Sequence, residues 1–286
     1  MSFIEELCYV TMSICHRICA LKSQNTKITK QKPVLDFNHL HDENLHDREL
    51  STSSKVSWRH EQKFWISNYQ YHRLRSAFRG ILYIDKHCYE EGDYNIRSLY
   101  FDSFAGEAAF DKLSGLSVRR KFRMRIYNRS SDVITMEIKN RFQDRISKQT
   151  CALQLDQALE LIEGELPRIQ DQNPVLMQLY HEMNQKLIKP TVLVEYDREA
   201  YVHPMGNVRI TFDKNLRSGG SRIDIFHPSP CSISVHSSEQ MILEVKFDDF
   251  LPMAVRKILS QQLTGPQTIS KYYLCRQHIH SWENGQ

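Results

Sequence analysis

The stretch Arg119-Arg120-Lys121-Phe122-Arg123-Met124-Arg125-Ile126-Tyr127 joins dense positive charge to the alternation of a β-strand. Successive side chains of a strand point to opposite faces. One face therefore carries four cations: Arg119, Lys121, Arg123 and Arg125. The other face carries Val118, Phe122, Met124 and Ile126, with Arg120 as the exception. The apolar face predicts packing on a core, whereas the basic face fits either a solvated surface or the lining of a cavity.

Four further segments repeat this alternation of charged and apolar side chains: residues 60–66, 134–139, 207–213 and 241–247. In the last of these, Glu244 and Lys246 alternate with Leu243 and Val245. A single strand of this kind most simply has a solvated charged face. Recurrence in five strands instead predicts a closed antiparallel β-barrel with a cationic lumen.

The repulsion between these cations limits what such a lumen can hold. Two cations about 6 Å apart at an effective dielectric constant near 20 repel each other by roughly 3 kcal/mol. Several in one lumen require carboxylates and a multivalent anion to offset the repulsion. The predicted ligand is therefore a polyanion with a divalent metal, most simply a chain of phosphates.

Helical spacing of apolar residues predicts four amphipathic helices, over residues 68–81, 156–167, 173–187 and 251–263. Asp156 is the expected N-cap of the second helix, which should bury Leu159 and Ile162. Pro174 suits the first position of the third. The predicted fold class is α+β, a closed antiparallel barrel with the helices packed outside.

Composition places the chain among globular proteins and excludes several classes. The 286 residues carry a net charge of +4, too small for a general nucleic-acid binder, and aromatics do not alternate with the basic strands as stacking platforms. No apolar run is long enough to span a membrane. The seven irregularly spaced cysteines predict free thiols in a reducing, cytoplasmic compartment. Cys15 and Cys19 are the only close pair, and no second pair follows them at the spacing of a zinc site.

The N-terminal region differs from the rest, since residues 22–55 are polar and turn-rich. Residues 1–57 are predicted to form a flexible extension, and folded sequence begins near Arg59. The chain has no P-loop, no G-x-G-x-x-G, no G-x-S-x-G and no His-Glu-x-x-His motif. Phosphate handling by strand side chains remains, and phosphoryl transfer needs little more than positioned cations, a metal and an in-line nucleophile.

Eight short segments in order make the chain resemble the VTC domain. This is the polyphosphate polymerase domain of the vacuolar transporter chaperone family, within the CYTH-like triphosphate tunnel metalloenzymes. The segments begin at Glu61, Arg97, Lys121, Met136, Glu195, Val208, Leu243 and Ser270. The resemblance implies a tunnel domain over residues 58–280.

The resemblance also implies roles for individual side chains. Seven cations are expected to hold a nucleotide triphosphate or a growing chain: Lys63, Arg123, Arg125, Lys139, Arg198, Arg209 and Lys271. Five more residues are expected to contact phosphate: Lys112, Lys121, Lys148, Lys246 and Ser270. Glu244 is expected to bind Mn²⁺ or Mg²⁺, while Glu61, Glu137 and Glu195 either assist it or neutralise nearby cations.

One of these roles conflicts with simple alternation. Arg198 is in phase with Val194 and Tyr196, which places it with the apolar set unless a β-bulge near Asp197 turns its side chain.

The function implied by the resemblance is a metal-dependent polyphosphate polymerase that transfers the γ-phosphate of ATP to orthophosphate or polyphosphate. An inorganic triphosphatase, or another CYTH-type phosphohydrolase, would use the same tunnel with water as acceptor. A non-catalytic polyphosphate-binding module is a third reading. Neither an SPX region nor a transmembrane helix is evident in the sequence, so a separate membrane-protein partner is expected for any coupled transport.

Overall fold

The computed structural model describes residues 57–88, 92–114, 116–165 and 173–283, with the side chains of 111–113 and 280–283 left out. The predicted extension up to residue 56, including Cys15 and Cys19, lies outside the described residues. No helix within the described ranges is both long and apolar enough to cross a membrane. The four cysteines in these ranges form no disulfide bond with one another: Cys88, Cys151, Cys231 and Cys275.

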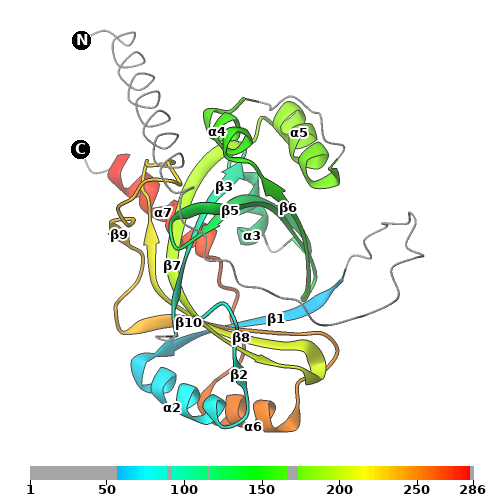
Figure 1. Cartoon of the computed structure of the whole chain (residues 1–286), viewed down its shortest axis with the longest axis vertical. Coiled ribbons are helices and arrows are strands. Elements are labelled where there is room, and N and C mark those ends of the chain that lie inside the picture. Colours follow the sequence, from blue (N-terminus) through cyan, green and yellow to red (C-terminus); the bar gives the residue numbers. More distant parts are fainter. Residues whose placement is uncertain (1–56, 89–91, 115, 166–172, 284–286) are drawn as a thin grey trace, which may run out of the picture. The chain divides into compact units, whose positions relative to one another are not determined.

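Eight long strands form a ring in which each pairs antiparallel with two others (Figure 1). In ring order they are β7 (Lys189–His203), β3 (Tyr94–Asp102), β4 (Val118–Tyr127), β5 (Ser130–Phe142), β6 (Arg145–Leu153), β1 (Arg59–Ser67), β10 (Gln240–Phe247) and β8 (Val208–Ser218). Pairing of β7 with β8 completes the ring. Two residue pairs join β6 to β1, which makes this the narrowest seam. The short strand β2 (Tyr83–Ile84) pairs with β7, and the short strand β9 (Ile233–Ser234) pairs with β8.

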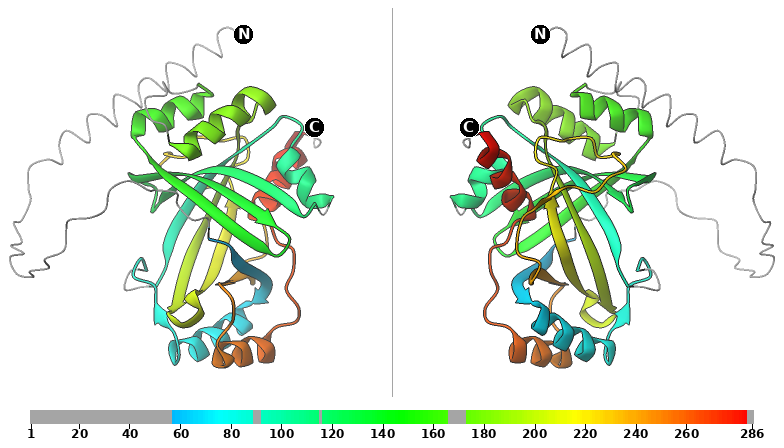
Figure 2. Two further views of the ribbon diagram at one scale, coloured as in Figure 1. Left: turned by 90° about the vertical axis from the view of Figure 1, so that its right-hand side faces the viewer. Right: turned by 90° about the vertical axis from the view of Figure 1, so that its left-hand side faces the viewer.

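Four helices cover the outside of the ring in two pairs, as predicted (Figure 2). Helices α4 (Leu155–Glu163) and α5 (Pro174–Lys186) pack on the outward side chains of β4, β5 and β6, such as Met124 and Met136. Helices α2 (Asn68–Arg79) and α6 (Met253–Gln262) pack on those of β1, β8 and β10, such as Phe212 and Leu243. The apolar halves of the alternating strands therefore form two outer cores, and this leaves their charged halves facing inward.

The remaining helices lie elsewhere. Helix α3 (Glu107–Leu113) follows β3, and the 3-10 turn η1 (Met205–Asn207) joins β7 to β8. Helix α7 (Lys271–Glu283) was not predicted from the sequence. Its Tyr272 and Cys275 pack against Val194 and Tyr196, whose side chains point inward from β7. One side of the barrel interior is thus an apolar core, and the charged lumen occupies the other.

Helix caps explain where the predicted helices start. Asn173 caps α5 through its side chain, with Pro174 at the first position as expected. The expectation for α4 was wrong by two residues, because Gln154 is the N-cap and Asp156 lies in the first turn. The reason is a capping box between Gln154 and Gln157, which starts the helix directly after β6. Ala158 and Leu161 are the fully buried residues of the helix, while the predicted Ile162 is partly buried and packs against the same core. The predicted Leu159 is only partly buried.

Candidate active site in the cationic lumen

Strand register aligns cations with carboxylates on the inward faces of the barrel. Arg123 lies opposite Glu137, Lys63 opposite Glu244, and Arg198 opposite Asp213. Directly opposed residues of an antiparallel pair share a face, so each pairing carries charge into the interior. The five predicted strands all have their charged set on this side.

These side chains enclose a cavity of about 100 Å³. Ten cations of the described residues line it: Lys63, Arg119, Lys121, Arg123, Arg125, Lys139, Arg141, Arg198, Lys246 and Lys271. Two carboxylates, Glu61 and Glu244, line it as well. Two more, Glu137 and Asp213, pair with lining cations. Cations still outnumber these carboxylates by six, so the lumen is suited to a multivalent anion.

A row of three lysines crosses the lumen wall, because Lys121, Lys139 and Lys148 occupy matching positions on β4, β5 and β6. Lys121 donates to Ser270 Oγ at 2.9 Å and lies 4.9 Å from the centre of the Tyr272 ring. Lys139 contacts Glu61 at 2.6 Å. Burial nevertheless holds the pKa of Lys139 well below its usual range, since Glu61 only partly offsets the loss of solvation and the repulsion from Lys63. A phosphate in the lumen would supply the missing negative charge.

Glu244 is the centre of the lysine cluster. Its carboxylate lies 2.6 Å from Lys246, 3.5 Å from Lys63 and 3.6 Å from Lys271. Burial raises its pKa, but the three lysines outweigh burial and hold the pKa well below the usual range. Glu244 is therefore a permanent anion inside a cationic cavity.

Asp213 forms ion pairs with two of the predicted cations, Arg198 and Lys271. Arg198 binds it through two hydrogen bonds of 2.6 and 2.9 Å, and Lys271 lies 2.5 Å away. The pKa of Asp213 is lowered because these two cations outweigh the effect of burial. Asp213 is completely buried and holds the two cations side by side at the cavity wall.

The conflict between the predicted role of Arg198 and its place in the strand alternation disappears, because the face of β7 that carries Arg198 and Tyr196 is the one that points into the lumen. Arg198 and Tyr196 both line the cavity, so they do share a face, and that face points into the lumen. The register shift between Glu195 and Asp197 puts the extra residue on β8, where Asn215 has a φ of 51°. The expectation of a bulge that turns Arg198 was therefore wrong, because Tyr196 is a lumen residue and not part of an outer core.

Most of the predicted site residues meet in this cavity. The cavity lining includes Lys63, Lys121, Arg123, Arg125, Lys139, Arg198, Lys246, Ser270, Lys271, Glu61 and Glu244. Arg209 is not part of the lining, because it pairs with Asp85 at 2.8 Å and binds the Tyr94 hydroxyl. Lys148 pairs with Glu137 at 3.1 Å and is half-exposed. The side chain of Lys112, in α3, lies outside the described residues.

Several lumen residues were missed by the sequence interpretation. Arg141 could have been found, since it follows Glu137 and Lys139 at the same spacing of two. The Tyr196 ring centre lies 5.2 Å from the Arg198 guanidinium and 4.9 Å from the Lys271 ammonium. The Tyr100 hydroxyl accepts a hydrogen bond of 2.9 Å from Arg123. Cation–π contacts of this kind carry no spacing signal in a sequence.

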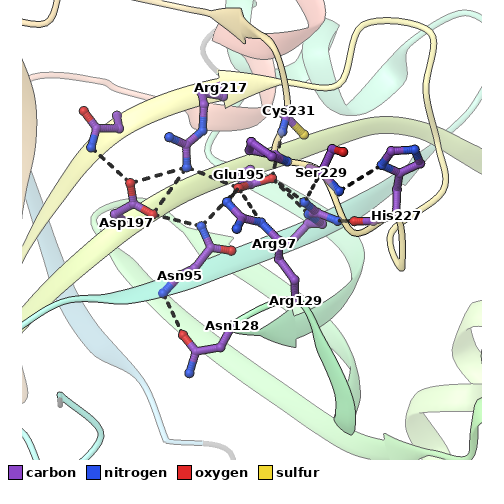
Figure 3. Close-up of polar contacts among 12 residues, drawn as sticks. Asn95, Arg97, Asn128, Arg129, Glu195, Asp197, Arg217, His227, Ser229 and Cys231 are labelled. Atoms are coloured by element: carbon purple, nitrogen blue, oxygen red, sulfur yellow. Dashed lines mark hydrogen bonds and ion pairs between the residues drawn. The ribbon is translucent and has the colours of Figure 1, made fainter. Parts of the chain in front are cut away.

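A second charged cluster, on the outward face of β3 and β7, contains Glu195. Figure 3 shows Arg97, Arg129 and Arg217 converging on this carboxylate. Burial raises the pKa of Glu195, but hydrogen bonds from Arg129, the Cys231 N–H and Arg97 lower it to about 2. Arg97 also donates to the backbone carbonyls of Ile225, His227 and Ser229. Glu195 therefore neutralises cations outside the lumen and is not placed to assist a metal within it.

The carboxylates of the lumen can hold a divalent metal only together with the phosphate oxygens of a substrate. No group of three or more metal-ligating side chains occurs in the part of the chain that the structure describes. Mg²⁺ and Mn²⁺ commonly use one or two carboxylates together with substrate phosphates. Glu244 and Glu61 line the cavity with oxygen donors and meet that requirement. Glu137 is less open to a metal because it is not part of the cavity lining. Its Oε2 accepts from Arg123 and its Oε1 from Lys148, just as both Glu61 oxygens accept from Lys139.

Comparisons with known proteins give one family. The model of the VTC domain matches residues 58–280. No curated protein matches the sequence. A candidate adenylyl cyclase from Hippeastrum, described as having a dominant triphosphatase activity, is 12% identical with a TM-score of 0.48, over 77% of this chain and 95% of that one. A candidate adenylate cyclase from Bacillus halodurans is 14% identical with a TM-score of 0.46, over 74% and 95%.

Proposed function

The chain belongs to the VTC domain family, and from that premise we propose that it is a metal-dependent polyphosphate polymerase. ATP is the donor, and orthophosphate or the end of a polyphosphate chain is the acceptor. The bond between the γ-phosphorus and the β,γ-bridging oxygen breaks while an acceptor oxygen bonds to that phosphorus, and ADP leaves. The observation that carries the proposal is the surplus of six cations around one cavity.

The lumen residues can be assigned parts in this transfer. Arg123 and Arg125 present guanidinium forks, which match the oxygens of phosphoryl groups. Lys63, Lys139 and Lys246 act as point charges from β1, β5 and β10. Asp213 fixes Arg198 and Lys271, so these two cations need no rearrangement when charge develops on the transferred group. Ser270, at the start of α7, offers a hydroxyl beside Lys121.

Mn²⁺ or Mg²⁺ held by Glu244 and Glu61 would neutralise phosphate oxygens and help to orient the triphosphate. The protein side chains alone already account for binding and orientation. Polymerisation also brings two anions together, and the surplus of lumen cations offsets the repulsion between donor and acceptor.

A product assay tests the proposal. Purified chain is incubated with ATP and either Mn²⁺ or Mg²⁺, and the products are separated on a gel that resolves phosphate chains. We expect long phosphate chains, with one molecule of ADP formed for each phosphate added to a chain. Release of orthophosphate from tripolyphosphate without elongation would replace the polymerase by a triphosphatase. Absence of phosphate chains, of ATP turnover and of orthophosphate release from tripolyphosphate would contradict both activities.

The Glu244→Ala variant separates catalysis from binding. A polymerase should lose turnover and its dependence on metal, because the variant lacks the cavity carboxylate best placed for the metal. A binding module should hold polyphosphate as well as before or better, since a competing anion has gone. From the family we further propose a cytoplasmic location beside a separate membrane-protein partner. Cysteines without disulfide bonds are consistent with the reducing conditions of that compartment.

A further inference from the structure

A second cavity of about 700 Å³ lies on the outside of the barrel, next to the mouth of the lumen. Its floor is formed by β4, β5 and β6, and its walls by α3 and α5. Arg119 and Arg141 line both this groove and the lumen, so the two cavities meet at these arginines. The groove is large enough for a ligand of the size of a nucleoside, since small-molecule sites usually measure about 300–1,000 Å³.

The groove combines exposed apolar side chains with a buried hydroxyl that has no hydrogen-bond partner among the described residues. Val118 and Phe142 are paired across β4 and β5, with 65% and 51% of their surface exposed. The Ser147 hydroxyl has no hydrogen-bond partner among the described residues although the residue is only 2% exposed. A buried hydroxyl without a partner costs free energy unless a ligand or water satisfies it. The side chain of Gln149, also in the lining, presents both a donor and an acceptor.

The charges of the groove argue against a phosphate chain as its occupant. Arg120 pairs with Glu182 at 3.0 Å, and Lys186 contacts the same carboxylate at 3.2 Å. A polyanion here would have to displace or face that glutamate. A nucleobase has flat apolar faces and a polar edge, which match aromatic stacking and amide or hydroxyl contacts.

We propose that this groove holds the purine base of the donor nucleotide while its triphosphate enters the lumen. The inference rests on the proposed function and deepens it, because it makes a nucleotide, rather than an inorganic triphosphate, the substrate that fits best. Arg119 and Arg141 would contact the α-phosphate at the boundary. Inward positions of β4 are about 7 Å apart along the strand, so Lys121 is the next inward cation after Arg119 on the path into the lumen.

Calorimetric titration of the intact chain tests this inference with two probes, ATP and inorganic tripolyphosphate. EDTA in the buffer removes divalent metal and prevents turnover. Phe142→Ala removes the stacking surface and should weaken ATP binding about tenfold, while tripolyphosphate binding changes by less than about twofold. The matched control is Phe250→Ala, which removes a similarly exposed phenylalanine (47%) that lines neither cavity and should change neither affinity.

Ser147→Ala provides a second variant that does not threaten folding, because it removes a hydroxyl with no partner among the described residues. We expect unchanged thermal unfolding and ATP binding weaker by about threefold. Unchanged ATP affinity in both variants, or an equal loss for both probes, would overturn the inference and leave the proposed function intact. Failure of the unaltered chain to bind either probe would instead contradict the proposed function, and the inference with it.

Discussion

The lumen and the Glu195 cluster are built from the same kinds of side chain, basic groups paired with carboxylates, and lie on opposite faces of the barrel wall. In the Glu195 cluster, the Glu195 carboxylate accepts hydrogen bonds from three arginines and from the Cys231 N–H (Figure 3). The remaining guanidinium N–H groups of Arg97 donate to backbone carbonyls such as that of Ile225. Around the lumen, cations exceed carboxylates by six and enclose a cavity. Both regions are dense in charge, but only the lumen combines a surplus with space.

This difference separates two uses of an ion pair. A buried pair whose hydrogen bonds are all made contributes to the uniqueness and stability of the fold when it is intact, and breaking it leaves an uncompensated charge. A pair at a cavity wall with excess charge is available for a ligand. Substitutions in the two regions should therefore affect different measurements.

The largest effect is expected from Arg123→Ala in the lumen. Arg123 binds Glu137 at 2.6 Å and presents its guanidinium to the cavity, so its loss removes charge from the transferred phosphoryl group. We expect kcat/KM for ATP to fall about 1,000-fold, in the range seen for cations that stabilise a phosphoryl-transfer transition state. Initial rates of ADP formation measure this, with thermal unfolding recorded in parallel.

Arg129→Ala is the matched control, since Arg129 also contacts its carboxylate, Glu195, at 2.6 Å. It should leave kcat/KM within about twofold and lower the unfolding temperature. Similar losses of activity in the two variants would show that the distinction between the regions is wrong.

Arg97→Ala should produce the largest loss of stability. The side chain is completely buried, and its removal strips donors from Glu195 and from the carbonyls of Ile225, His227 and Ser229. The free energy of unfolding should fall by about 3–5 kcal/mol, as for other broken buried pairs. Urea denaturation at neutral pH measures it. Turnover per folded molecule should be unchanged, and a stable variant with lost turnover would place Arg97 in the catalytic machinery.

The pH dependence of stability examines the Glu195 cluster alone. The pKa of Glu195 is lowered from its ordinary value of 4.5 to about 2, so its contribution is present in full above pH 4.5 and is lost as the pH falls toward 2. Glu195→Gln should cost about 2 kcal/mol of unfolding free energy at neutral pH. The difference between the two proteins should shrink below pH 4.5. A difference that stays constant with pH would mean that charge on Glu195 does not stabilise the fold.

The sequence could predict which face each charge occupies, but not what it meets there. Alternation in the β4 segment correctly placed Arg119, Lys121, Arg123 and Arg125 on one wall of the lumen. Alternation gives no depth, so it could not show that Arg209 is held by Asp85, a residue next to a two-residue strand. The apolar spacing also missed α7, which packs on inward side chains of β7 such as Val194 and Tyr196 rather than on an outer core.

The spacing of residues also could not predict the role of Asp213, because this role depends on ion pairs with Arg198 and Lys271, which lie on other elements. The groove under α5 was not predicted either, since its lining comes from six separate elements. Local pattern therefore predicts strands and faces, whereas pairing and cavities depend on contacts between distant residues.

The smallest expected effect, from Lys148→Ala, asks where the lumen ends. Lys148 lies in the same row as Lys139, but 48% of its side chain is exposed and it does not line the cavity. Solvent screens an exposed charge, so kcat/KM for ATP should fall by only about threefold, and by less at high salt. Lys139→Ala should cost about 100-fold under the same conditions, because Lys139 lines the enclosed cavity. Equal losses in the two variants would mean that the lysine row, rather than enclosure within the barrel, defines the site, and that position on a strand matters more than surplus charge in a confined space.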